Sequence, residues 1–239
     1  LSVMSSQGDA GQFRTPRHII DYIVACLDPK KNETIADPAC GTAGFLLSAY
    51  KYIVQQNTDK RLGDQLTPDQ RKKMASNIVG YDISPDMVRL SLANMYLHGF
   101  ATPLIHEYDS LSSEDRWQET FDVILANPPF GGIVANNNET NFPQTYRTKE
   151  SADLFLILMI HLLKQDGRAG IVLPDGSLTG DGVKQRIRQK LLEDCNLHTI
   201  IRLPNSVFQP YATVATNLLF FDKGKPTKDI WYYEHRMPE

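Results

Sequence analysis

The chain has 239 residues, of which 41% are hydrophobic, and this is enough for one sizeable α/β domain. Its formal net charge of −3 argues against a free-standing DNA-binding protein, which needs a surplus of Lys and Arg to displace phosphate counterions. The three cysteines, Cys26, Cys40 and Cys195, lack the paired spacing of a zinc site or a disulfide framework. This use of cysteine fits a reducing, cytoplasmic setting best. No apolar run approaches the roughly 20 residues that cross a bilayer, so we expect no membrane contact.

The two ends of the chain differ in composition from its middle. Residues 1–12 are polar, and the chain begins at Leu1 rather than Met, so we expect a linker or the end of a missing N-terminal domain there. The main domain is expected over residues 13–222. Residues 223–239 are expected to begin a truncated C-terminal extension, with one more strand possible at DIWYY (229–233).

Apolar, β-branched runs alternate with helix-like segments along the chain. This order favours a mostly parallel sheet with crossover helices. The last two runs are too close together for a packed helix between them, so an antiparallel pair at the sheet edge is expected. The seven strands are predicted at 33–39, 77–83, 102–111, 121–129, 168–174, 197–204 and 216–222.

Helix-capping and helix-breaking residues predict where several helices begin and end. Ser84 is a suitable N-cap with Pro85 at the first helical position, and Gly99 is placed to end that helix. A short helix is expected after Pro68. An almost wholly apolar helix begins at Ser151 and is expected to be buried and to be closed by Gly167.

A polar segment, residues 131–150, follows the fourth strand directly. Four of its side chains are candidates for DNA contact, although an ordinary mobile loop is equally consistent with its composition: Phe142, Tyr146, Arg147 and Lys149. A later basic set spreads around a helix and is interpreted as a solvated surface first and a DNA contact second: Lys184, Arg186, Arg188 and Lys190.

A glycine-containing turn follows the first strand in DPACGTAGF (37–45). Asp37 ends the strand, and Gly41 and Gly44 bracket the turn into a helix, where backbone can approach a ligand closely. A plain tight βα turn is about as consistent with so short a motif. A nucleotide phosphate site is disfavoured, because the third glycine of the dinucleotide fingerprint and the Lys-Ser/Thr of the phosphate loop are missing.

Acidic residues stand at the ends of the first three strands. Asp82, in GYDIS, could accept hydrogen bonds from a ribose diol or, alternatively, cap the next helix in competition with Ser84. Asp109, in YDSL, completes the row. Ligands of open α/β sheets bind at these strand ends, and the row suits a ligand with an adenosine and an ammonium group.

The fourth run ends in NPPF, residues 127–130. Each proline fixes φ and removes a backbone donor, so this is a costly way to end a strand unless the residues are needed for what they present. Asn127 offers a side-chain carbonyl and Pro128 a rigid backbone carbonyl. Taken alone, the motif is better explained by a strand that prolines terminate, with Phe130 in the core.

Six motifs in one order resemble those of S-adenosylmethionine-dependent DNA adenine methyltransferases, and look most like the modification subunit of type I restriction-modification systems. The resemblance covers nearly the whole chain and implies the class I methyltransferase fold, with a seven-stranded mixed sheet, mostly parallel with an antiparallel edge strand, flanked by helices. The domain over 13–222 would then be the catalytic domain. The motifs are FRTP (13–16), DPACGTAGF (37–45), GYDI (80–83), YDSL (108–111), NPPF (127–130) and GRAGIVLPDGSL (167–178).

The resemblance also implies roles for individual residues toward S-adenosylmethionine. Asp37, Gly41 and Gly44 would hold its methionine moiety with Ala39 beside them, Asp82 and Ile83 would flank the ribose, and Asp109 would hold the adenine. Thr15 and Pro16, in FRTP, would close over the methionine end, although a proline at an ordinary helix start is the simpler alternative. The chain departs from the family at Ala43, where a glycine is usual, and at Arg14, where an aromatic residue is usual.

The same resemblance implies methylation of the exocyclic N6 amine of an adenine flipped out of double-stranded DNA. Asn127 and Pro128 would accept the amine hydrogens, Pro129 would brace the Pro128 carbonyl, and Phe130 would stack on the base; no metal is needed. With no obvious sequence-reading domain and an acidic balance, a DNA-specificity subunit and a restriction subunit are implied as partners. Three alternatives stay open: a protein glutamine methyltransferase, an RNA adenine methyltransferase, and a catalytically silent cofactor-binding subunit.

Overall fold

The structure is a computed structural model that describes residues 14–112, 115–134, 137–209 and 214–235. The linker expected at residues 1–12 lies outside the described residues, as does Phe13 of the FRTP motif. Among the described residues, no helix combines the length and the apolar character needed to span a membrane.

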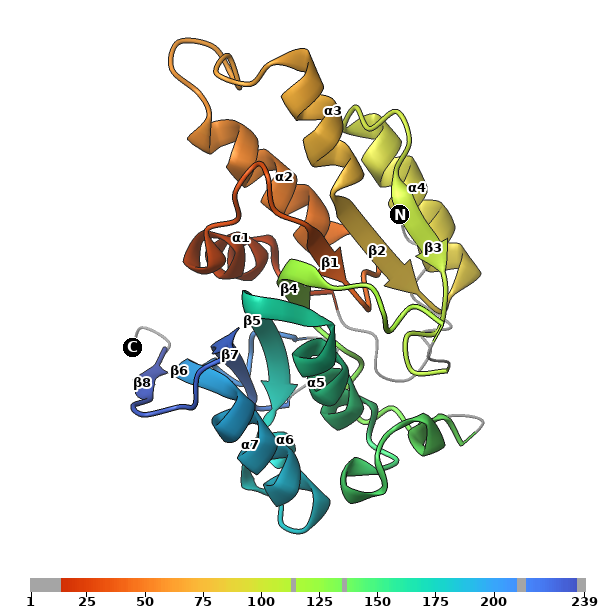
Figure 1. The fold of residues 1–239 in the computed structure, drawn as a ribbon, viewed down its shortest axis with the longest axis vertical. Coiled ribbons are helices and arrows are strands. Elements are labelled where there is room, and N and C mark those ends of the chain that lie inside the picture. The colour runs from red at the N-terminus through yellow and green to blue at the C-terminus, as the bar shows by residue number, and fades with distance from the viewer. Residues whose placement is uncertain (1–13, 113–114, 135–136, 210–213, 236–239) are drawn as a thin grey trace.

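The helices and strands alternate through most of the chain (Figure 1). The helices are α1 (Arg17–Leu27), α2 (Gly44–Gln56), α3 (Pro68–Ser76), α4 (Pro85–Leu97), α5 (Ser151–Leu162), α6 (Asp175–Thr179) and α7 (Val183–Asp194), with short 3-10 turns η1 (Asn138–Asn141) and η2 (Gln144–Tyr146). The strands are β1 (Ile35–Asp37), β2 (Ile78–Asp82), β3 (Leu104–Glu107), β4 (Phe121–Ala126), β5 (Leu163–Pro174), β6 (Cys195–Arg202), β7 (Thr216–Lys223) and β8 (Trp231–Glu234).

All strands of the described residues join one sheet in the order β3-β2-β1-β4-β5-β7-β6-β8. Strands β1 to β5 pair in parallel, and β7 is antiparallel to both β5 and β6, which confirms the expected antiparallel pair. The seven expected strands become eight in the described part of the chain, because the further strand considered possible at DIWYY (229–233) forms β8, which pairs in parallel with β6 at the outer edge. The strand β7 therefore lies inside the sheet, between β5 and β6.

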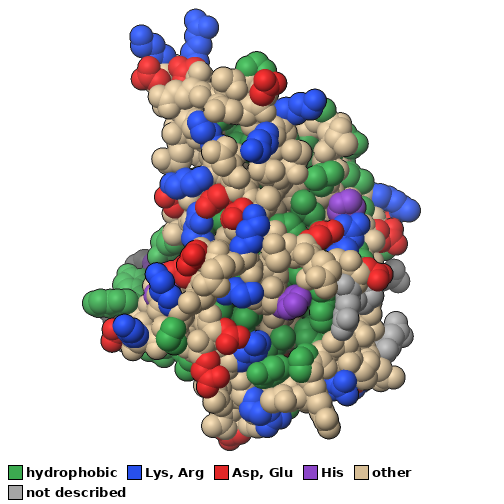
Figure 2. Space-filling model, in the orientation of Figure 1, with side chains coloured by type: hydrophobic (Ala, Val, Ile, Leu, Met, Phe, Trp, Pro, Cys, Tyr) green, Lys and Arg blue, Asp and Glu red, His purple; other side chains and the backbone are tan. Residues whose placement is uncertain are grey.

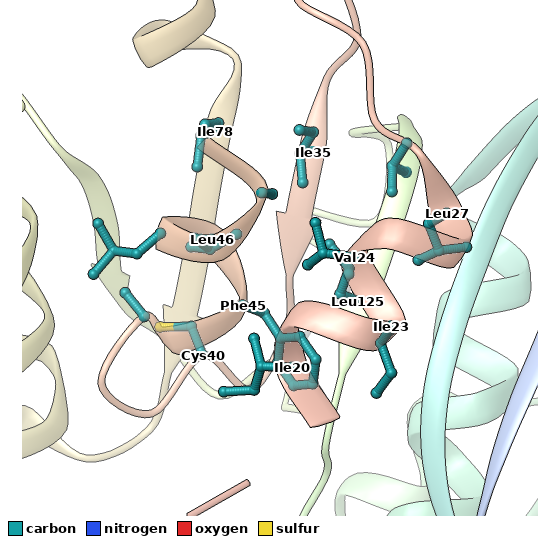
Figure 3. Close-up of a cluster of buried hydrophobic side chains, with 14 of the residues drawn as sticks. Ile20, Ile23, Val24, Leu27, Ile35, Cys40, Phe45, Leu46, Ile78 and Leu125 are labelled. Carbon is teal, nitrogen blue, oxygen red and sulfur yellow. The ribbon is translucent and has the colours of Figure 1, made fainter. Parts of the chain in front are cut away.

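Two hydrophobic cores lie on opposite faces of the sheet, because alternate side chains of a strand point to opposite faces. In β4, Val123 and Leu125 belong to one core, while Ile124 and Ala126 belong to the other. The first core packs beneath α1 and α2, where Ile20, Ile23, Val24 and Leu27 meet Ile35, Phe45, Leu46, Ile78 and Leu125 (Figure 3). The second packs beneath α5 and α7. This burial on both faces fixes the sheet, and with it the relative positions of the strand ends.

Helix α5 is buried along almost its entire length, as the sequence predicts, but it ends at Leu162 and passes directly into β5. Gly167 therefore does not close the helix. It lies in β5, where a Cβ would come within 2.9 Å of the carbonyl oxygen of Lys164 and 3.1 Å of that of Asp122. Glycine is needed there for close approach of two backbones rather than as a helix stop.

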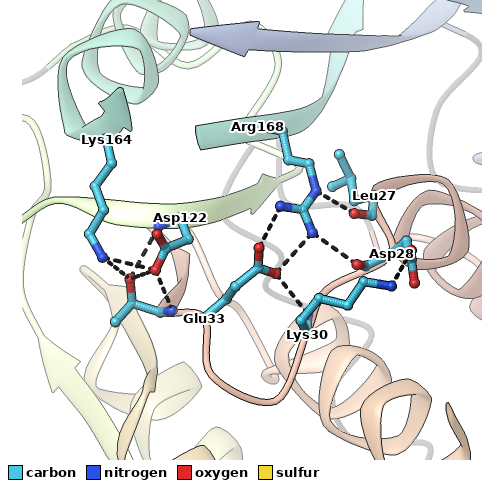
Figure 4. A network of polar contacts seen from close by, with 8 residues as sticks. Leu27, Asp28, Lys30, Glu33, Asp122, Lys164 and Arg168 are labelled. Carbon is cyan, nitrogen blue, oxygen red and sulfur yellow. Dashed lines mark hydrogen bonds and ion pairs between the residues drawn. The ribbon is translucent and has the colours of Figure 1, made fainter. Parts of the chain in front are cut away.

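A polar network joins α1 to the start of β1 and to β5, at the end of the sheet away from the carboxyl ends of β1 and β4 (Figure 4). The Arg168 guanidinium donates to both carboxylate oxygens of Glu33, at 2.8 and 2.9 Å, and to the carbonyl oxygens of Leu27 and Asp28. The carbonyls of Leu27 and Asp28 stand at the end of α1 and have no partner in the next helical turn. Arg168 thus anchors the C-terminal end of α1 to the sheet.

Candidate active site

The carboxyl ends of β2, β1 and β4 lie side by side, at the same end of these three strands. These three strands are neighbours and parallel, so the residues that end or follow them come together in space. Asp82 ends β2, Asp37 ends β1 and Asn127 follows β4. The structure therefore brings the predicted cofactor end and the predicted chemical end of the sequence to one place.

Asp37 is buried and only partly satisfied. Its side chain is 1% exposed, and its Oδ1 accepts a hydrogen bond from the backbone N–H of Ala39 at 3.0 Å. Its Oδ2 has no hydrogen-bond partner among the described residues. Burial raises the pKa of Asp37 from 3.8 to about 8, the Ala39 N–H opposes the rise, and the Asp82 carboxylate adds to it. A cationic ligand at this carboxylate would relieve both the desolvation and the unmet acceptor.

The turn from Asp37 into α2 is held by two other elements. The Gly41 N–H donates to Asp82 Oδ2 at 2.9 Å, the Ser91 hydroxyl donates to the Gly41 carbonyl at 2.9 Å, and the Asn94 amide donates to the Thr42 carbonyl at 2.8 Å. Gly41 has φ +51°, in the left-handed region that favours glycine, and a Cβ added there would have no atom within 4 Å. The turn is preorganised and open on the side of Gly41.

Ala43 occupies a second left-handed position, with φ +62°, just before α2 begins at Gly44. A glycine adopts this conformation freely, whereas alanine pays a steric cost for it. The departure of this chain from the family at Ala43 therefore concerns backbone conformation as well as side-chain size.

Asp82 bridges the turn before α2 and the start of α4. Besides accepting from Gly41, its Oδ1 accepts from the N–H of Ser84 at 2.9 Å, while the Ser84 hydroxyl caps α4 through the N–H of Met87. Burial raises the pKa of Asp82, and the Ser84 and Gly41 N–H groups oppose the rise. Each carboxylate oxygen retains a second lone-pair site for a ligand. The next residue, Ile83, is 59% exposed and presents an apolar side chain to solvent at the same strand end.

Asp109, after β3, is joined to the segment that follows NPPF. Its Oδ1 accepts from the N–H of Leu111 at 3.0 Å and its Oδ2 from the amide of Asn138 at 2.8 Å. The Asn141 amide donates to the Leu111 carbonyl at 2.9 Å. The sequence pattern did not single out Asn138, and the signal available was an Asn-rich run beside a candidate site.

Three of the candidate DNA contacts of the segment 131–150 are engaged with other side chains or carbonyls of the chain. Phe142 is 2% exposed and packs against Trp117, and the Arg147 guanidinium donates to the carbonyls of Phe142 and Thr140. Lys149 pairs with Glu139 at 2.5 Å. These side chains hold the segment in shape, so the structure gives no support to their use as DNA contacts.

The basic set of α7 is likewise tied to the chain's own acceptors. Lys184 pairs with Glu150 and with the buried Asp153, Lys190 pairs with Asp194, and Arg186 donates to a backbone carbonyl. Figure 2 shows acidic and basic side chains interspersed on the face that carries α5 and α7, with no continuous basic patch. This pattern matches a solvated surface.

Asn127 has its two amide ends in different environments. Its Nδ2 donates to the hydroxyl of Thr15 at 2.8 Å, and its buried Oδ1 has no hydrogen-bond partner among the described residues. The carbonyl of Pro129 accepts from the Ser151 hydroxyl at 3.0 Å, so the first residue of α5 holds the double-proline turn. Ser151 was not among the predicted site residues. The site thus contains a fixed carboxamide with an unused acceptor.

Thr15 and Pro16 lie at the start of α1. Pro16 is the N-cap of the helix, with its carbonyl accepting from the N–H groups of Ile19 and Ile20. The simpler alternative for the motif, a proline at a helix start, therefore describes Pro16 correctly. Thr15 in addition reaches the amide of Asn127, which the sequence did not predict.

Phe130, which the resemblance assigns to stacking on the base, is buried in the structure. Phe130 is 6% exposed and packs in the first core, with its ring edge-on to Phe208 at a centroid distance of 6.0 Å. Phe208 follows β6, which β5 and β7 separate from β4 in the sheet. Burial of an aromatic ring among apolar neighbours is stabilising. Stacking on a base would require the segment around Phe208 to move.

Comparison with known proteins agrees with this arrangement. The family model described as N-6 DNA Methylase matches residues 3–239. The chain belongs to this methylase family. Among relatives, the methylase subunit of the type I restriction enzyme EcoEI from Escherichia coli is 46% identical over 100% of this chain, which covers 48% of that protein.

Solved structures of the methylase family and its fold match as well. The crystal structure of the type I restriction enzyme EcoKI M protein aligns with a TM-score of 0.83 and 33% identity, over 93% of this chain and 48% of that one. A Listeria monocytogenes protein described as a class I S-adenosylmethionine-dependent methyltransferase aligns with a TM-score of 0.73 over 97% of this chain and 68% of that one; at 21% identity it shows the fold alone. The fold is that of the class I methyltransferases. The chain spans about half the length of the curated relatives it matches.

Proposed function

We propose that the protein transfers a methyl group from S-adenosylmethionine to the N6 amine of adenine in double-stranded DNA, as the modification subunit of a type I restriction-modification system. The observation that carries this proposal is the buried Oδ1 of Asn127, which has no hydrogen-bond partner in the described part of the chain. Asn127 precedes two prolines and adjoins the strand ends that carry Asp37 and Asp82. Its relatives are named as type I methylase subunits.

The residues at the strand ends fit S-adenosylmethionine. The buried Oδ2 of Asp37, which has no partner among the described residues, suits the cationic methionine end, and the open side of Gly41 leaves room for it. Gly44, whose missing Cβ would lie 3.0 Å from Ile20, is proposed to lie beside the same end of the cofactor with Ala39, Thr15 and Pro16. The spare lone pairs of Asp82 suit the ribose hydroxyls, and the exposed Ile83 suits the flat face of the adenine. Asp109 would hold the adenine edge together with its partner Asn138.

Bound there, S-adenosylmethionine supplies an electrophilic methyl group on a positively charged sulfur, which is left as a neutral thioether after transfer. Asn127 Oδ1 and the Pro128 carbonyl accept the two amine hydrogens, which favours a tetrahedral nitrogen whose lone pair is available. The fixed acceptors contribute through position and electrostatics. After transfer the nitrogen is positively charged and loses one hydrogen as a proton to solvent, so no strong base is needed beforehand.

Base entry needs a change at Phe130. Its ring would stack on the flipped adenine once the segment around Phe208 is displaced, and such stacking contributes about 1–3 kcal/mol per base. Pro129 is proposed to hold the Pro128 carbonyl in position, and its own carbonyl accepts a hydrogen bond from the Ser151 hydroxyl.

The assembly that we propose follows from the lack of a positive charge surplus on this chain. The net charge is −3, and basic residues of α7 are engaged with acidic residues of the chain itself. We therefore assign most of the contacts with the DNA backbone to a DNA-specificity subunit. A restriction subunit joins them in the complete complex. We place this assembly in the cytoplasm. We also extend the catalytic domain beyond residue 222, at least to Glu234, because β8 completes the sheet.

The test is transfer of labelled methyl groups by the full-length protein in its assembled complex. Duplex DNA, single-stranded RNA of the same sequence and candidate proteins are offered in parallel with labelled S-adenosylmethionine. Label on the N6 of adenine in duplex DNA is expected. Label on protein glutamine or on RNA alone would replace the proposal with one of the two alternative methyltransferases. Cofactor binding without any transfer would support the catalytically silent subunit.

A further inference from the structure

The loop after β3 is fastened to the carboxyl ends of β1 and β2. The N–H of Tyr108 donates to the carbonyl of Asp82, the last residue of β2, at 2.9 Å. The buried hydroxyl of Ser110 donates to the carbonyl of Pro38, which directly follows β1, at 2.8 Å. Asp109 stands between these two anchored residues, so its backbone has a fixed place beside the proposed cofactor site.

The order of the strands matches the order of the parts of S-adenosylmethionine. Strands β1, β2 and β3 are successive neighbours in the sheet, at the spacing of about 4.8 Å that parallel strands keep. In the proposed binding mode the methionine end lies at Asp37 and the ribose at Asp82, so the adenine extends over the loop that follows β3. Asp109 lies in this loop, and its carboxylate suits the exocyclic amine of the adenine, which donates hydrogen bonds.

The carboxylate of Asp109 is held from two sides. Its Oδ1 accepts from the N–H of Leu111 at 3.0 Å, a contact within the loop itself. Its Oδ2 accepts from Nδ2 of Asn138 at 2.8 Å, and Asn138 lies 29 positions further along the chain, in η1. An ionised carboxylate only accepts hydrogen bonds, so the donor end of the Asn138 amide must face it.

We propose that Asn138 is a positioning residue for the cofactor adenine, which holds the carboxylate of Asp109 so that a lone pair of Oδ2 faces the exocyclic amine. This inference rests on the cofactor site of the proposed function and deepens it. A carboxylate oxygen has two lone-pair sites, so Oδ2 can accept from Asn138 and from the amine together. Asn138 is 8% exposed, and a buried amide of this kind keeps one orientation of its partner.

A carboxylate that is fixed in this way selects for an amine. S-inosylhomocysteine has a carbonyl oxygen where S-adenosylhomocysteine has the amine, and this oxygen would meet Oδ2 of Asp109 acceptor against acceptor. Sites built to bind an N–H group reject analogues that lack it. Without Asn138 the carboxylate can rotate away from the opposing oxygen, so the preference for the adenosyl compound should fall.

Asn141 offers a matched control in the same 3-10 turn. Its amide donates to the carbonyls of Leu111 and Ser112, at 2.9 and 2.7 Å. Asn141 therefore binds the backbone of the same loop, whereas Asn138 binds the carboxylate. Substitution of Asn141 removes contacts that fasten the turn to the loop and leaves the donor of Asp109 in place.

The variants Asn138→Leu, Asn138→Ala and Asn141→Leu are compared in the full-length protein assembled in its complex. The Kd values of S-adenosylhomocysteine and S-inosylhomocysteine are measured by calorimetric titration. Asn138→Leu is expected to raise the Kd of the adenosyl compound by about 2- to 12-fold, the range for one net hydrogen bond, and to change that of the inosyl compound by less than about twofold. Asn138→Ala, which is smaller, should lower the same preference. In Asn141→Leu the two Kd values should move together.

A second background separates positioning of Asp109 from general damage to the site. In Asp109→Ala the carboxylate is absent, so Asn138 has nothing to position. Asn138→Leu is therefore expected to change the Kd of S-adenosylhomocysteine by less than about twofold in that background, which is the non-additivity of residues in contact.

Several results would overturn the inference. They are an unchanged ratio of the two Kd values in both Asn138 variants, an equal fall of that ratio in Asn141→Leu, and a full loss of affinity from Asn138→Leu in the Asp109→Ala background. Equal binding of the two compounds by the unaltered complex would also overturn it. If the unaltered complex binds S-adenosylhomocysteine with the expected preference but methylates no DNA adenine, the proposed function fails and the role of Asn138 is retained. If it binds neither compound, both fail.

Discussion

Asp82 and Asp37 are electrostatically coupled across neighbouring strand ends, and the carboxylate of Asp82 adds to the rise that burial produces in the pKa of Asp37. The pKa of Asp37 is raised from 3.8 to about 8, which moves the ionisation of this carboxyl in the free protein from the acidic range to near neutral pH. A ligand with a positive charge lowers the pKa of Asp37, because it favours the ionised form of the carboxyl. If S-adenosylmethionine binds at Asp37 as proposed, its binding and proton release are linked at this site.

This linkage predicts that binding of S-adenosylmethionine strengthens as the pH rises from 6 to 8 and releases up to roughly one proton. Calorimetric titration in two buffers of different ionisation enthalpy measures the proton count. Asp37→Asn cannot ionise, so its weaker binding is expected to be independent of pH in this range. Release of no proton by the unaltered protein would contradict the raised pKa or the contact with the ligand.

The raised pKa of Asp37 also predicts how the free energy of unfolding changes with pH. Because its folded pKa is raised, its contribution to the free energy of unfolding is fully present below about pH 4 and is lost as the pH rises through about 8. The difference in unfolding free energy between the protein and Asp37→Asn should therefore shift in favour of Asn between pH 5 and pH 8. Urea denaturation at several pH values measures this, and a difference that is flat with pH would refute the direction.

Removal of the Asn127 acceptor should slow methyl transfer strongly and leave the cofactor site intact. Asn127→Ala is expected to lower the methyl transfer rate by about 100- to 1,000-fold, the effect of losing one preorganised hydrogen-bonding group. The Kd for S-adenosylmethionine is the control and should change little, since Asp37 and Asp82 are unaltered. A variant that transfers methyl groups at the normal rate would remove Asn127 from the mechanism.

The aromatic face of Phe130 can be separated from its packing by a matched pair of substitutions. Phe130→Leu should lower the transfer rate by about 5- to 150-fold if the ring stacks on the base, the range given by about 1–3 kcal/mol. Phe142→Leu alters a similarly buried ring that packs against Trp117 and should destabilise the fold to a similar degree without that loss. Equal activity losses in both variants would indicate that Phe130 contributes packing alone.

The contacts of Arg168, at the opposite end of the sheet, should stabilise the fold more than a surface ion pair does. Arg168→Leu is expected to lower the free energy of unfolding by about 2–4 kcal/mol, because it leaves Glu33 and the carbonyls of α1 without their partner. Arg89→Leu is the control, since Arg89 and its partner Asp86 are each 77% exposed, and its effect should lie within about 0.5 kcal/mol. Similar losses from chemical denaturation of the two variants would contradict the anchoring role of Arg168.

The sequence by itself determined which segments form the sheet and which residues stand at its strand ends. Alternating apolar runs and punctuation such as Ser84, Pro85 and Gly99 depend on local backbone preferences, and these appear in the structure as predicted. Because neighbouring parallel strands align their carboxyl ends, the motifs around Asp37, Asp82 and Asn127 also predicted that these residues share one site.

The tertiary structure alone decided how those residues are held. Thr15 reaches Asn127 across 112 positions, Asn138 reaches Asp109 across 29, and Phe130 is covered by Phe208. The place of β7 between β5 and β6 and the addition of β8 were settled in the same way. Local periodicity reports which face of an element is buried, whereas these contacts depend on which distant surfaces pack together, and no local pattern specifies that choice.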